Sequence, residues 1–404
     1  MTSDVGVKNV DIHEFIERDR NRIVEFAREL IAIPSENPPG ARYEEAVNAI
    51  VRHLKQLGFD PQIHGNCVLT FVGDRDDRVL YFSGHYDVVP AQDSHQFEPV
   101  VKGRNLFGRG SSDMKGGLAA MVYATKAVRD GRQKLAGQIG LVFVPDEETA
   151  GPRGSRALEQ EGLLGRNAVG MLTPEPTGGI IWNANRGAIT AKATLTGKPA
   201  HVGRQFEGIN AFEGMMRLVQ SLAELKKDVE TRATAFAIEP ERAKHSILLL
   251  GGQSAGGTNF NVVPEACWFT VDRRINPEED FETEKRRLIS LVQNGAKPCE
   301  ARIEILQEGL AAGTPADTPL GNALARSIQR VSGTAPRFEM CPGLLETRFY
   351  AAHGIPAYAY GPGLLTVSHG PNEFVPIDNV TKCAAIYAST ALELLSQASG
   401  VIPE

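Results

Sequence analysis

RVLYFSGHYDVVP, residues 78–90, is the stretch around which the rest of the chain is organised. Its apolar run, Val79–Phe82, is followed by Ser83-Gly84, a pattern typical of a buried strand in a parallel sheet. His85 and Asp87 follow two residues apart, so an extended backbone directs both side chains to one face. A histidine beside a carboxylate often forms a metal ligand together with the group that orients it. For this pair alone, two polar residues on a surface loop are the simpler interpretation.

Two further apolar runs, at 139–144 and 169–172, also end in acids, and no lysine or arginine stands directly beside them. These acids are Asp146, Glu147, Glu148 and Glu175. In open α/β sheets, ligands bind outside the carboxyl ends of the strands. Clustered carboxylates raise each other's pKa, and a bound dication removes that repulsion. The three strand ends together therefore favour a metal site.

Asp113 lies in a glycine-rich stretch, GRGSSDMKGGLAA at 108–120, directly before an alanine-rich segment that we expect to be helical. A carboxylate at this junction is either a helix cap or a metal ligand that projects into a cleft. The stretch lacks both the spacing of a dinucleotide-binding fingerprint and the ending of a phosphate loop. We therefore exclude a nucleotide-binding role for these glycines.

Composition narrows the class of protein. The chain has 404 residues, 42% hydrophobic and 23% charged, with a formal net charge of -6, which fits a globular protein of about two domains. It carries no basic stripe and no apolar stretch of about 18 residues, so we expect no nucleic acid and no membrane as partners. The polar N-terminal segment lacks the apolar region of a signal peptide, which favours a cytoplasmic location. The five cysteines include no CxxC pair, so a metal here is held by His, Asp and Glu.

The periodicities predict an α/β fold built from two domains. Apolar residues at helical spacing predict helices over 11–33, 42–57, 116–129, 318–331 and 377–397, and a further strand is expected at 356–363. Residues 188–307 read as β-α-β-β-α-β, a split βαβ unit. We therefore expect a discontinuous catalytic domain, at 1–187 and 308–404, with a mostly parallel central sheet flanked by helices. An α+β, ferredoxin-like domain at 188–307 is inserted into it.

Eight motifs in order resemble a known family. It is the family of co-catalytic zinc metallopeptidases and deacylases that includes acetylornithine deacetylase, succinyl-diaminopimelate desuccinylase, aminoacylase and glutamate carboxypeptidase. The motifs are GHYDVVP (84–90), GRGSSDMKGGLAA (108–120), PDEETAG (145–151), TPEP (173–176), GKPAHVGRQFEGINA (197–211), NVVP (261–264), DRRI (272–275) and YGPG (360–363) followed by SHGPNE (368–373). The resemblance covers nearly the whole chain.

The resemblance implies a pair of metal sites. Asp113 is expected to bridge two divalent ions, with His85 and Glu175 completing one site and Glu148 and His369 the other. Oxygen and nitrogen ligands suit Zn²⁺, and Co²⁺ or Mn²⁺ could replace it. The family also places a cis peptide bond directly after the bridging aspartate.

The same resemblance assigns catalytic and substrate-binding roles. Glu147 is the expected general base towards a metal-bridging hydroxide, and Asp87 is expected to orient His85. His201 of the inserted domain is expected to stabilise the oxyanion, often in the active site of a partner subunit. Arg274 and Asn261 resemble the residues that contact the substrate carboxylate.

We expect a hydrolase that cleaves an amide-type C–N bond of a small carboxylate-bearing substrate, such as an N-acyl amino acid or a dipeptide. Where the family commonly has Asp-Ala-Arg, this chain has Glu346-Thr347-Arg348. That departure motivates an alternative, an aminohydrolase that releases ammonia from a small amine, aromatic amines included. A catalytically inactive binding protein of the same fold is the third hypothesis. The family's habit also suggests a homodimer formed through the inserted lid and dimerisation domain.

Overall fold

The structure is a computed structural model that describes residues 12–132 and 134–396. The chain forms two compact units, one of Met1–Asn183, Thr314–Phe338 and Phe349–Glu404 and one of Ala184–Gly313 and Glu339–Arg348. The start of the polar N-terminal segment and the expected helix ends at 11 and 397 lie outside the described residues. None of the helices in the described ranges is both long and apolar enough to cross a membrane.

The centre of the largest sheet consists of β6 (Gln138–Val144), β3 (Val79–His85) and β7 (Ala168–Thr173), in that order. Both neighbouring pairs are parallel. All three strands are mostly buried, as their continuous apolar runs predict. Their carboxyl ends therefore meet at one edge of the sheet.

The full sheet has nine strands, in the order β1-β2-β6-β3-β7-β15-β8-β13, with β14 beside β8. The outer strands are β1 (Gln62–His64), β2 (Cys67–Val72), β15 (Ala357–Ala359), β8 (Ile181–Asn185), β13 (Ala312–Gly313) and β14 (Phe338–Cys341). β15 runs parallel to β7, whereas β2 is antiparallel to β6 and β15 to β8. The predicted mostly parallel core is confirmed, although β15 is shorter than the strand expected at 356–363.

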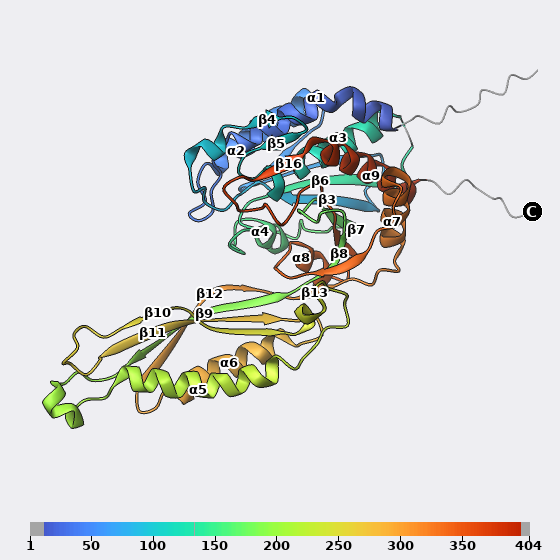
Figure 1. Cartoon of the computed structure of the whole chain (residues 1–404). Helices are drawn as coiled ribbons and strands as arrows, with labels where there is room; N and C mark the ends of the chain where they lie inside the picture. The colour runs from blue at the N-terminus through green and yellow to red at the C-terminus, as the bar shows by residue number, and fades with distance from the viewer. Residues whose placement is uncertain (1–11, 133, 397–404) are drawn as a thin grey trace, which may run out of the picture. The chain divides into compact units, whose positions relative to one another are not determined.

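Helices cover both faces of this sheet (Figure 1). One face carries the larger core, formed with α1 (Ile12–Ile31), α2 (Tyr43–Gln56), α3 (Gly116–Asp130), α7 (Pro319–Ser332) and α9 (Ile377–Leu395). The other face packs against α4 (Ser155–Gln160) and α8 (Thr347–Ala352), through Leu158 and Tyr350. The short helical turns are η1 (Ser94–Phe97), η2 (Ser111–Lys115), η3 (Val202–Glu207) and η4 (Glu241–Lys244).

A small sheet of order β16-β5-β4 lies apart from the main one. Its strands are β4 (Val100–Lys102), β5 (Asn105–Phe107) and β16 (Phe374–Pro376), and Phe107 lies opposite Phe374. β5 leads directly into the glycine-rich segment that carries Asp113, and β16 directly follows the segment that carries His369. The strand pair therefore brings together two segments that are far apart in the sequence.

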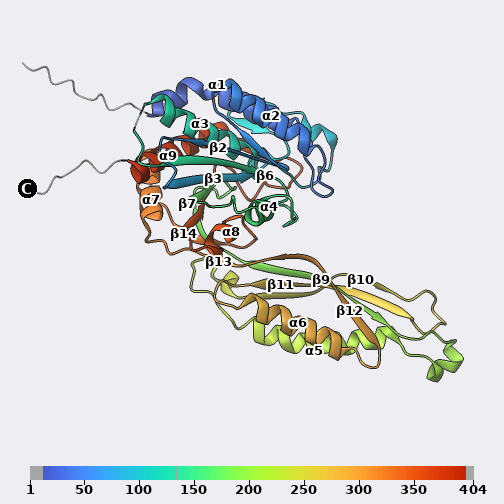
Figure 2. The same cartoon turned by 180° about the vertical axis from the view of Figure 1, so that it is seen from behind.

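The second unit contains a four-stranded antiparallel sheet of order β10-β11-β9-β12. Its elements are β9 (Gly187–Thr196), α5 (Ala211–Val229), β10 (Ile247–Gly256), β11 (Ala266–Ile275), α6 (Phe281–Gly295) and β12 (Glu300–Gly309), so the predicted β-α-β-β-α-β order is confirmed. Figure 2 shows α5 and α6 side by side along one face of this sheet. The unit includes more residues than the predicted insertion at 188–307, because the segment Glu339–Arg348 packs with it. For example, Met340 N–H donates a hydrogen bond to Ala237 O at 2.6 Å.

Candidate metal centre

The carboxyl ends of the three central strands bring imidazole and carboxylate groups together. His85 ends β3, and Glu148 follows β6 in the turn after Val144. Ligand atoms of His85, Asp113 and Glu148 all lie within 4.8 Å of one another, a spacing that suits one metal ion. His369 joins them, with Nε2 at 3.3 Å from Asp113 Oδ2 and 3.4 Å from Glu148 Oε2. Asp113 thus lies between two imidazoles, because its Oδ1 is 3.2 Å from His85 Nε2.

Glu175, just beyond β7, is buried beside the same groups. Burial, and then the charge of Asp113, raise the pKa of Glu175 well above its usual value. Oε1 of Glu175 and Oε1 of Glu148 are buried and have no hydrogen-bond partner within the described ranges. Buried oxygens without a donor are costly, and a cation is the partner that such oxygens fit. The donor set, two imidazoles and three carboxylates, suits zinc and similar dications.

The electrostatics of the cluster also point to a cation. The carboxylates of Asp113 and then Glu148 raise the pKa of His369 to about 10. For His85, burial opposes the charged form, but hydrogen bonds to Asp113 and Asp87 outweigh it and raise the pKa well above the usual value. The carboxylates thus create a potential that attracts positive charge, whether protons on the imidazoles or bound dications.

Asp87 connects His85 to the turn that carries Glu147 and Glu148. His85 Nδ1 lies 3.0 Å from the backbone O of Asp87 and 3.4 Å from its Oδ1. The Asp87 carboxylate also accepts the N–H groups of Glu147 and Glu148, both at 3.3 Å, and Nδ2 of Asn37 at 2.9 Å. Its position therefore fits the predicted orienting role and adds support for the acid turn.

Asp146 stands apart from the cluster, contrary to the expectation that these acids lack a basic partner. Its side chain accepts hydrogen bonds from Arg153 Nη2 at 2.8 Å and from Tyr43 OH at 2.9 Å. Burial opposes ionisation, but these bonds to Arg153 and Tyr43 lower the pKa of Asp146. Asp146 has a φ of 67°, so its backbone makes the sharp turn that leads into Glu147. The half-buried Glu147 adds its charge to those that raise the pKa values of His85 and Glu175.

The peptide bond between Asp113 and Met114 is cis, as the resemblance implies. Arg109 and Glu373, two residues not predicted from the sequence, form a buried ion pair of 2.6 Å beside the cluster. The available signal was an arginine in a glycine-rich loop, four positions before Asp113. Its partner is 264 positions away, so no local pattern could identify it.

His201, Asn261 and Arg274 belong to the second unit, and their roles towards the metal cluster stay predictions. His201 and Asn261 lie on adjoining segments, because Val202 N–H donates to Asn261 O at 2.9 Å. Nδ1 of the exposed His201 accepts Gly203 N–H at 3.1 Å. That bond favours the tautomer with the proton on Nε2, which makes the other ring nitrogen a donor.

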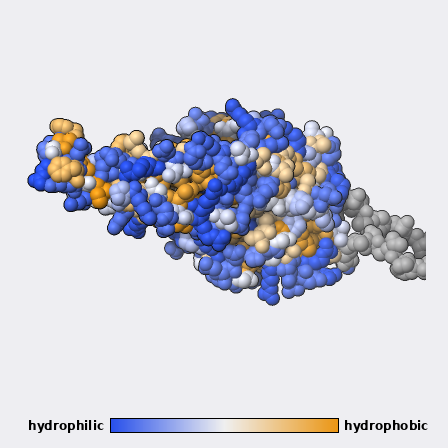
Figure 3. Space-filling view, turned by 90° about the horizontal axis from the view of Figure 1, so that it is seen from below, coloured by the Kyte–Doolittle hydropathy of each residue, from blue (hydrophilic) through white to orange (hydrophobic). Residues whose placement is uncertain are grey.

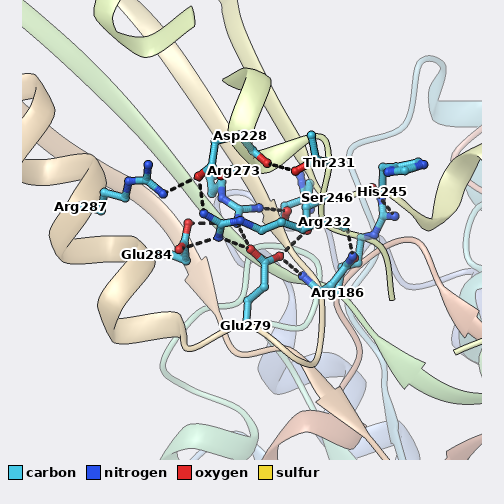
Figure 4. A network of polar contacts seen from close by, with 12 residues as sticks. Arg186, Asp228, Thr231, Arg232, His245, Ser246, Arg273, Glu279, Glu284 and Arg287 are labelled. Carbon is cyan, nitrogen blue, oxygen red and sulfur yellow. Dashed lines mark hydrogen bonds and ion pairs between the residues drawn. The ribbon is translucent and has the colours of Figure 1, made fainter. Parts of the chain in front are cut away.

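Arg274 lies on β11, one residue after a member of the network of polar contacts that Figure 4 shows. Its Nη2 pairs with Asp272 Oδ2 at 2.8 Å. The neighbouring Arg273 is buried and pairs with Glu284 at 3.1 Å and also with Glu279. The network therefore fixes the strand end from which the Arg274 side chain leaves.

The segment that departs from the family pattern forms internal contacts. Glu346 and Arg348 are buried and pair at 3.2 Å. Thr347 Oγ1 donates to Asn185 Oδ1 at 3.2 Å. The three residues therefore have packing roles within the second unit.

Comparison with known proteins gives one family and many related structures. The sequence profile described as "Peptidase family M20/M25/M40" matches residues 81–393. An M20 family metallo-carboxypeptidase from Sulfolobus solfataricus is similar at a TM-score of 0.77 and 19% identity, over 92% of this chain and 98% of that one. Human carnosine dipeptidase 1 is similar at a TM-score of 0.71 and 18% identity, over 95% of this chain and 98% of that one. A dinuclear metal-binding M20 peptidase from Bacillus subtilis is similar at a TM-score of 0.68 and 15% identity, over 94% of this chain and 99% of that one. These structural likenesses establish the fold.

Proposed function

This chain belongs to peptidase family M20/M25/M40, and from that premise we propose that it hydrolyses the amide bond of a small carboxylate-bearing substrate, an N-acyl amino acid or a dipeptide. The observation that carries the proposal is the convergence of His85, Asp113, Glu148 and His369 at the edge of the central sheet. Metal-dependent amide hydrolysis is the chemistry of this family. The substrate class is our inference.

We propose that two divalent ions, Zn²⁺ in the first instance, bind here, with Co²⁺ or Mn²⁺ as substitutes. Asp113 would bridge them, His85 and Glu175 would complete one site, and Glu148 and His369 the other. When bound, the ions would polarise the scissile carbonyl and lower the pKa of a coordinated water. The buried Oε1 atoms of Glu148 and Glu175, which have no hydrogen-bond partner within the described ranges, support this assignment. So does the similarity to the dinuclear peptidase of Bacillus subtilis.

Within this site, Glu147 would act as the general base. It would accept a proton from the attacking water while the water oxygen bonds to the carbonyl carbon. The same carboxyl would then deliver the proton to the leaving nitrogen as the C–N bond breaks. Asp87 would hold both His85 and the backbone of Glu147 in place for these steps.

The second unit would supply the remaining contacts. We propose that His201 stabilises the oxyanion through Nε2–H, which the bond from Gly203 to Nδ1 supports. Arg274 and Asn261 would bind the substrate carboxylate, with Arg274 exchanging its contact with Asp272 for the substrate. No feature of the described residues favours the aminohydrolase alternative, because the segment that motivated it is engaged in internal packing.

We also propose a homodimer in the cytoplasm. β10 is an edge strand of its sheet, and Leu249 on it is 53% exposed. Phe212 and Met216 on the neighbouring α5 are similarly exposed, and Figure 3 shows apolar residues on this unit towards the left end of the view. Exposed apolar side chains beside a free strand edge suit pairing with a second copy. The five free cysteines support a reducing compartment.

Chelation tests the proposal. Protein stripped by a chelator should lose hydrolysis of N-acyl amino acids and dipeptides, and Zn²⁺, Co²⁺ or Mn²⁺ should restore it. The panel should include N-acetyl, N-succinyl and N-acyl-aromatic amino acids, dipeptides and simple aryl amines. Ammonia release from the amines would revive the aminohydrolase alternative, and full turnover without metal would end the proposal.

Glu147→Gln separates proton transfer from metal binding. This variant should bind two ions per chain, since Glu147 is not a proposed ligand, but lose about 10²–10⁴-fold in kcat. The matched control is Glu148→Gln, which should lower the metal content as well as kcat. Metal analysis beside steady-state kinetics measures both. A Glu147→Gln variant with near-normal kcat would remove Glu147 from the mechanism.

A further inference from the structure

Two segments that supply proposed metal ligands are anchored to the same strand pair. β5 leads into the segment that carries Asp113, and the segment that carries His369 leads into β16. At the junction, Gly108 N–H donates to Glu373 O at 3.0 Å. The two backbones therefore run side by side as they approach the cluster.

Arg109 and Glu373 link these segments through their side chains. Both side chains are almost fully buried, at 1% and 0% exposure, and Arg109 Nη1 lies 2.6 Å from Glu373 Oε2. A buried ion pair contributes little to stability by itself, because desolvation offsets the attraction unless further hydrogen bonds satisfy the remaining atoms. The further hydrogen bonds of this pair are therefore the informative feature.

Glu373 uses its second oxygen to hold the backbone of the bridging aspartate. Oε1 accepts the N–H groups of Ser112 at 3.0 Å and Asp113 at 3.1 Å. Charge-assisted bonds of this kind are stronger than neutral ones. The Glu373 carboxylate thus fixes the point from which the Asp113 side chain leaves the main chain.

Arg109 holds the backbone of the other segment. Its Nη2 donates to His369 O at 3.1 Å, and its Nη1 lies 3.4 Å from Gly370 O. Gln92 completes the arrangement, because its Oε1 accepts from Arg109 Nη2 at 3.0 Å and its Nε2 donates to His369 O at 3.0 Å. His369 has a φ of 63°, a conformation that residues other than glycine keep only when their surroundings hold it.

We propose that Arg109 and Glu373 are positioning residues that fix the spacing between the Asp113 carboxylate and the His369 imidazole. The ion held by Glu148 and His369 would then depend on this pair. The inference rests on the proposed metal site. Neither side chain contacts a ligand atom in the described structure, and both act through the main chain of the residues that do. Partners that orient metal ligands typically affect metal affinity about 10–100-fold.

Arg109→Lys is the sharpest test. A lysine keeps the positive charge opposite Glu373 but cannot reproduce the fork that reaches His369 O and Gln92. Apoprotein titrated with Zn²⁺ by calorimetry should show one of its two affinities weakened about 10–100-fold and the other retained. Gln92→Ala should weaken the same affinity by a smaller factor. Because Gln92 is exposed, this variant decides the question should Arg109→Lys fail to fold.

The matched control is Asp19→Asn, which weakens another buried pair of the first unit, Lys126 and Asp19 at 2.7 Å. It should lower the melting temperature of the apoprotein without changing either Zn²⁺ affinity. If Arg109→Lys likewise lowers only the melting temperature and leaves both Zn²⁺ affinities unchanged, the role of Arg109 is purely structural and the inference is overturned. Wild-type protein that fails to bind two ions would instead overturn the proposed function, so the two failures are distinguishable.

Discussion

At the scale of single residues, the Asp87 carboxylate determines how several other groups are held. Its two oxygens both act as acceptors, Oδ1 for Glu147 N–H and Oδ2 for Glu148 N–H and Asn37 Nδ2. No orientation of an amide in its place could accept all three, since one end of an amide only donates. The negative charge and the shape of Asp87 are therefore both required.

Asp87→Asn should destabilise the protein by about 1–3 kcal/mol, the cost of a buried donor that faces another donor. It should also lower kcat, because the turn that carries Glu147 is displaced. Urea unfolding and steady-state kinetics measure the two effects. Asp93→Asn is the control, since Asp93 caps an exposed turn by accepting His95 N–H at 2.9 Å and asparagine caps as well. Equal stability of the two variants would contradict the role assigned to Asp87.

At the scale of elements, the periodic helices could be predicted and the long-range polar contacts could not. The helix expected over 11–33 is α1, Ile12–Ile31, because apolar spacing along one face is a local signal. The three strands that end in His85, Glu147–Glu148 and Glu175 were expected to meet, since parallel strands share an edge. The partner of Arg109 could not be predicted from the sequence. Glu373 is brought to it by the strand pair β5–β16, which joins distant parts of the chain.

Helix α2 should make stability depend on pH through His53. This ring stacks on Phe26 of α1 at 3.8 Å and its Nε2 lies 3.2 Å from Tyr123 OH of α3. Burial lowers the pKa of His53 from 6.5 to about 4, so only the unfolded chain binds its proton between those values. The corresponding stability is present above pH 6.5 and is lost as the pH falls towards 4.

When the pH is lowered from 7 to 5, His53 should reduce the free energy of unfolding by roughly 1–2 kcal/mol, after allowance for screening by water. His53→Phe keeps the stacked ring and cannot titrate, so its unfolding free energy should fall less over the same interval. Urea unfolding at both pH values, in wild type and variant, gives the difference. An identical fall in the two proteins would show that His53 does not titrate as described.

At the scale of the whole molecule, the sheet of the second unit has two edge strands, and we expect only one of them to form a dimer interface. Leu249 on β10 and Leu306 on β12 are about equally exposed, at 53% and 51%. We expect only the β10 edge to pair with a second copy, because α5, which carries the exposed Phe212 and Met216, packs against that strand. Introducing a charge at one edge and then the other distinguishes them.

Light scattering after gel filtration should give twice the chain mass of 43.7 kDa for wild type. Leu249→Glu should shift the mass towards one chain, because an uncompensated carboxylate is costly in an apolar interface. Leu306→Glu should leave the dimer intact. A wild-type mass equal to one chain, or a loss of the dimer in Leu306→Glu alone, would refute the assignment of the β10 edge.

One feature of β9 and β12 bears on how such a protein could have evolved. Ala188, near the start of β9, lies opposite Gly309, at the end of β12. The polypeptide thus enters and leaves this four-stranded module through adjacent positions. Modules with neighbouring ends can be exchanged, enlarged or deleted with little disturbance to their host. Selection could therefore remodel this module, to which we assign substrate contacts and self-association, while the residues of the proposed metal site stayed unaltered.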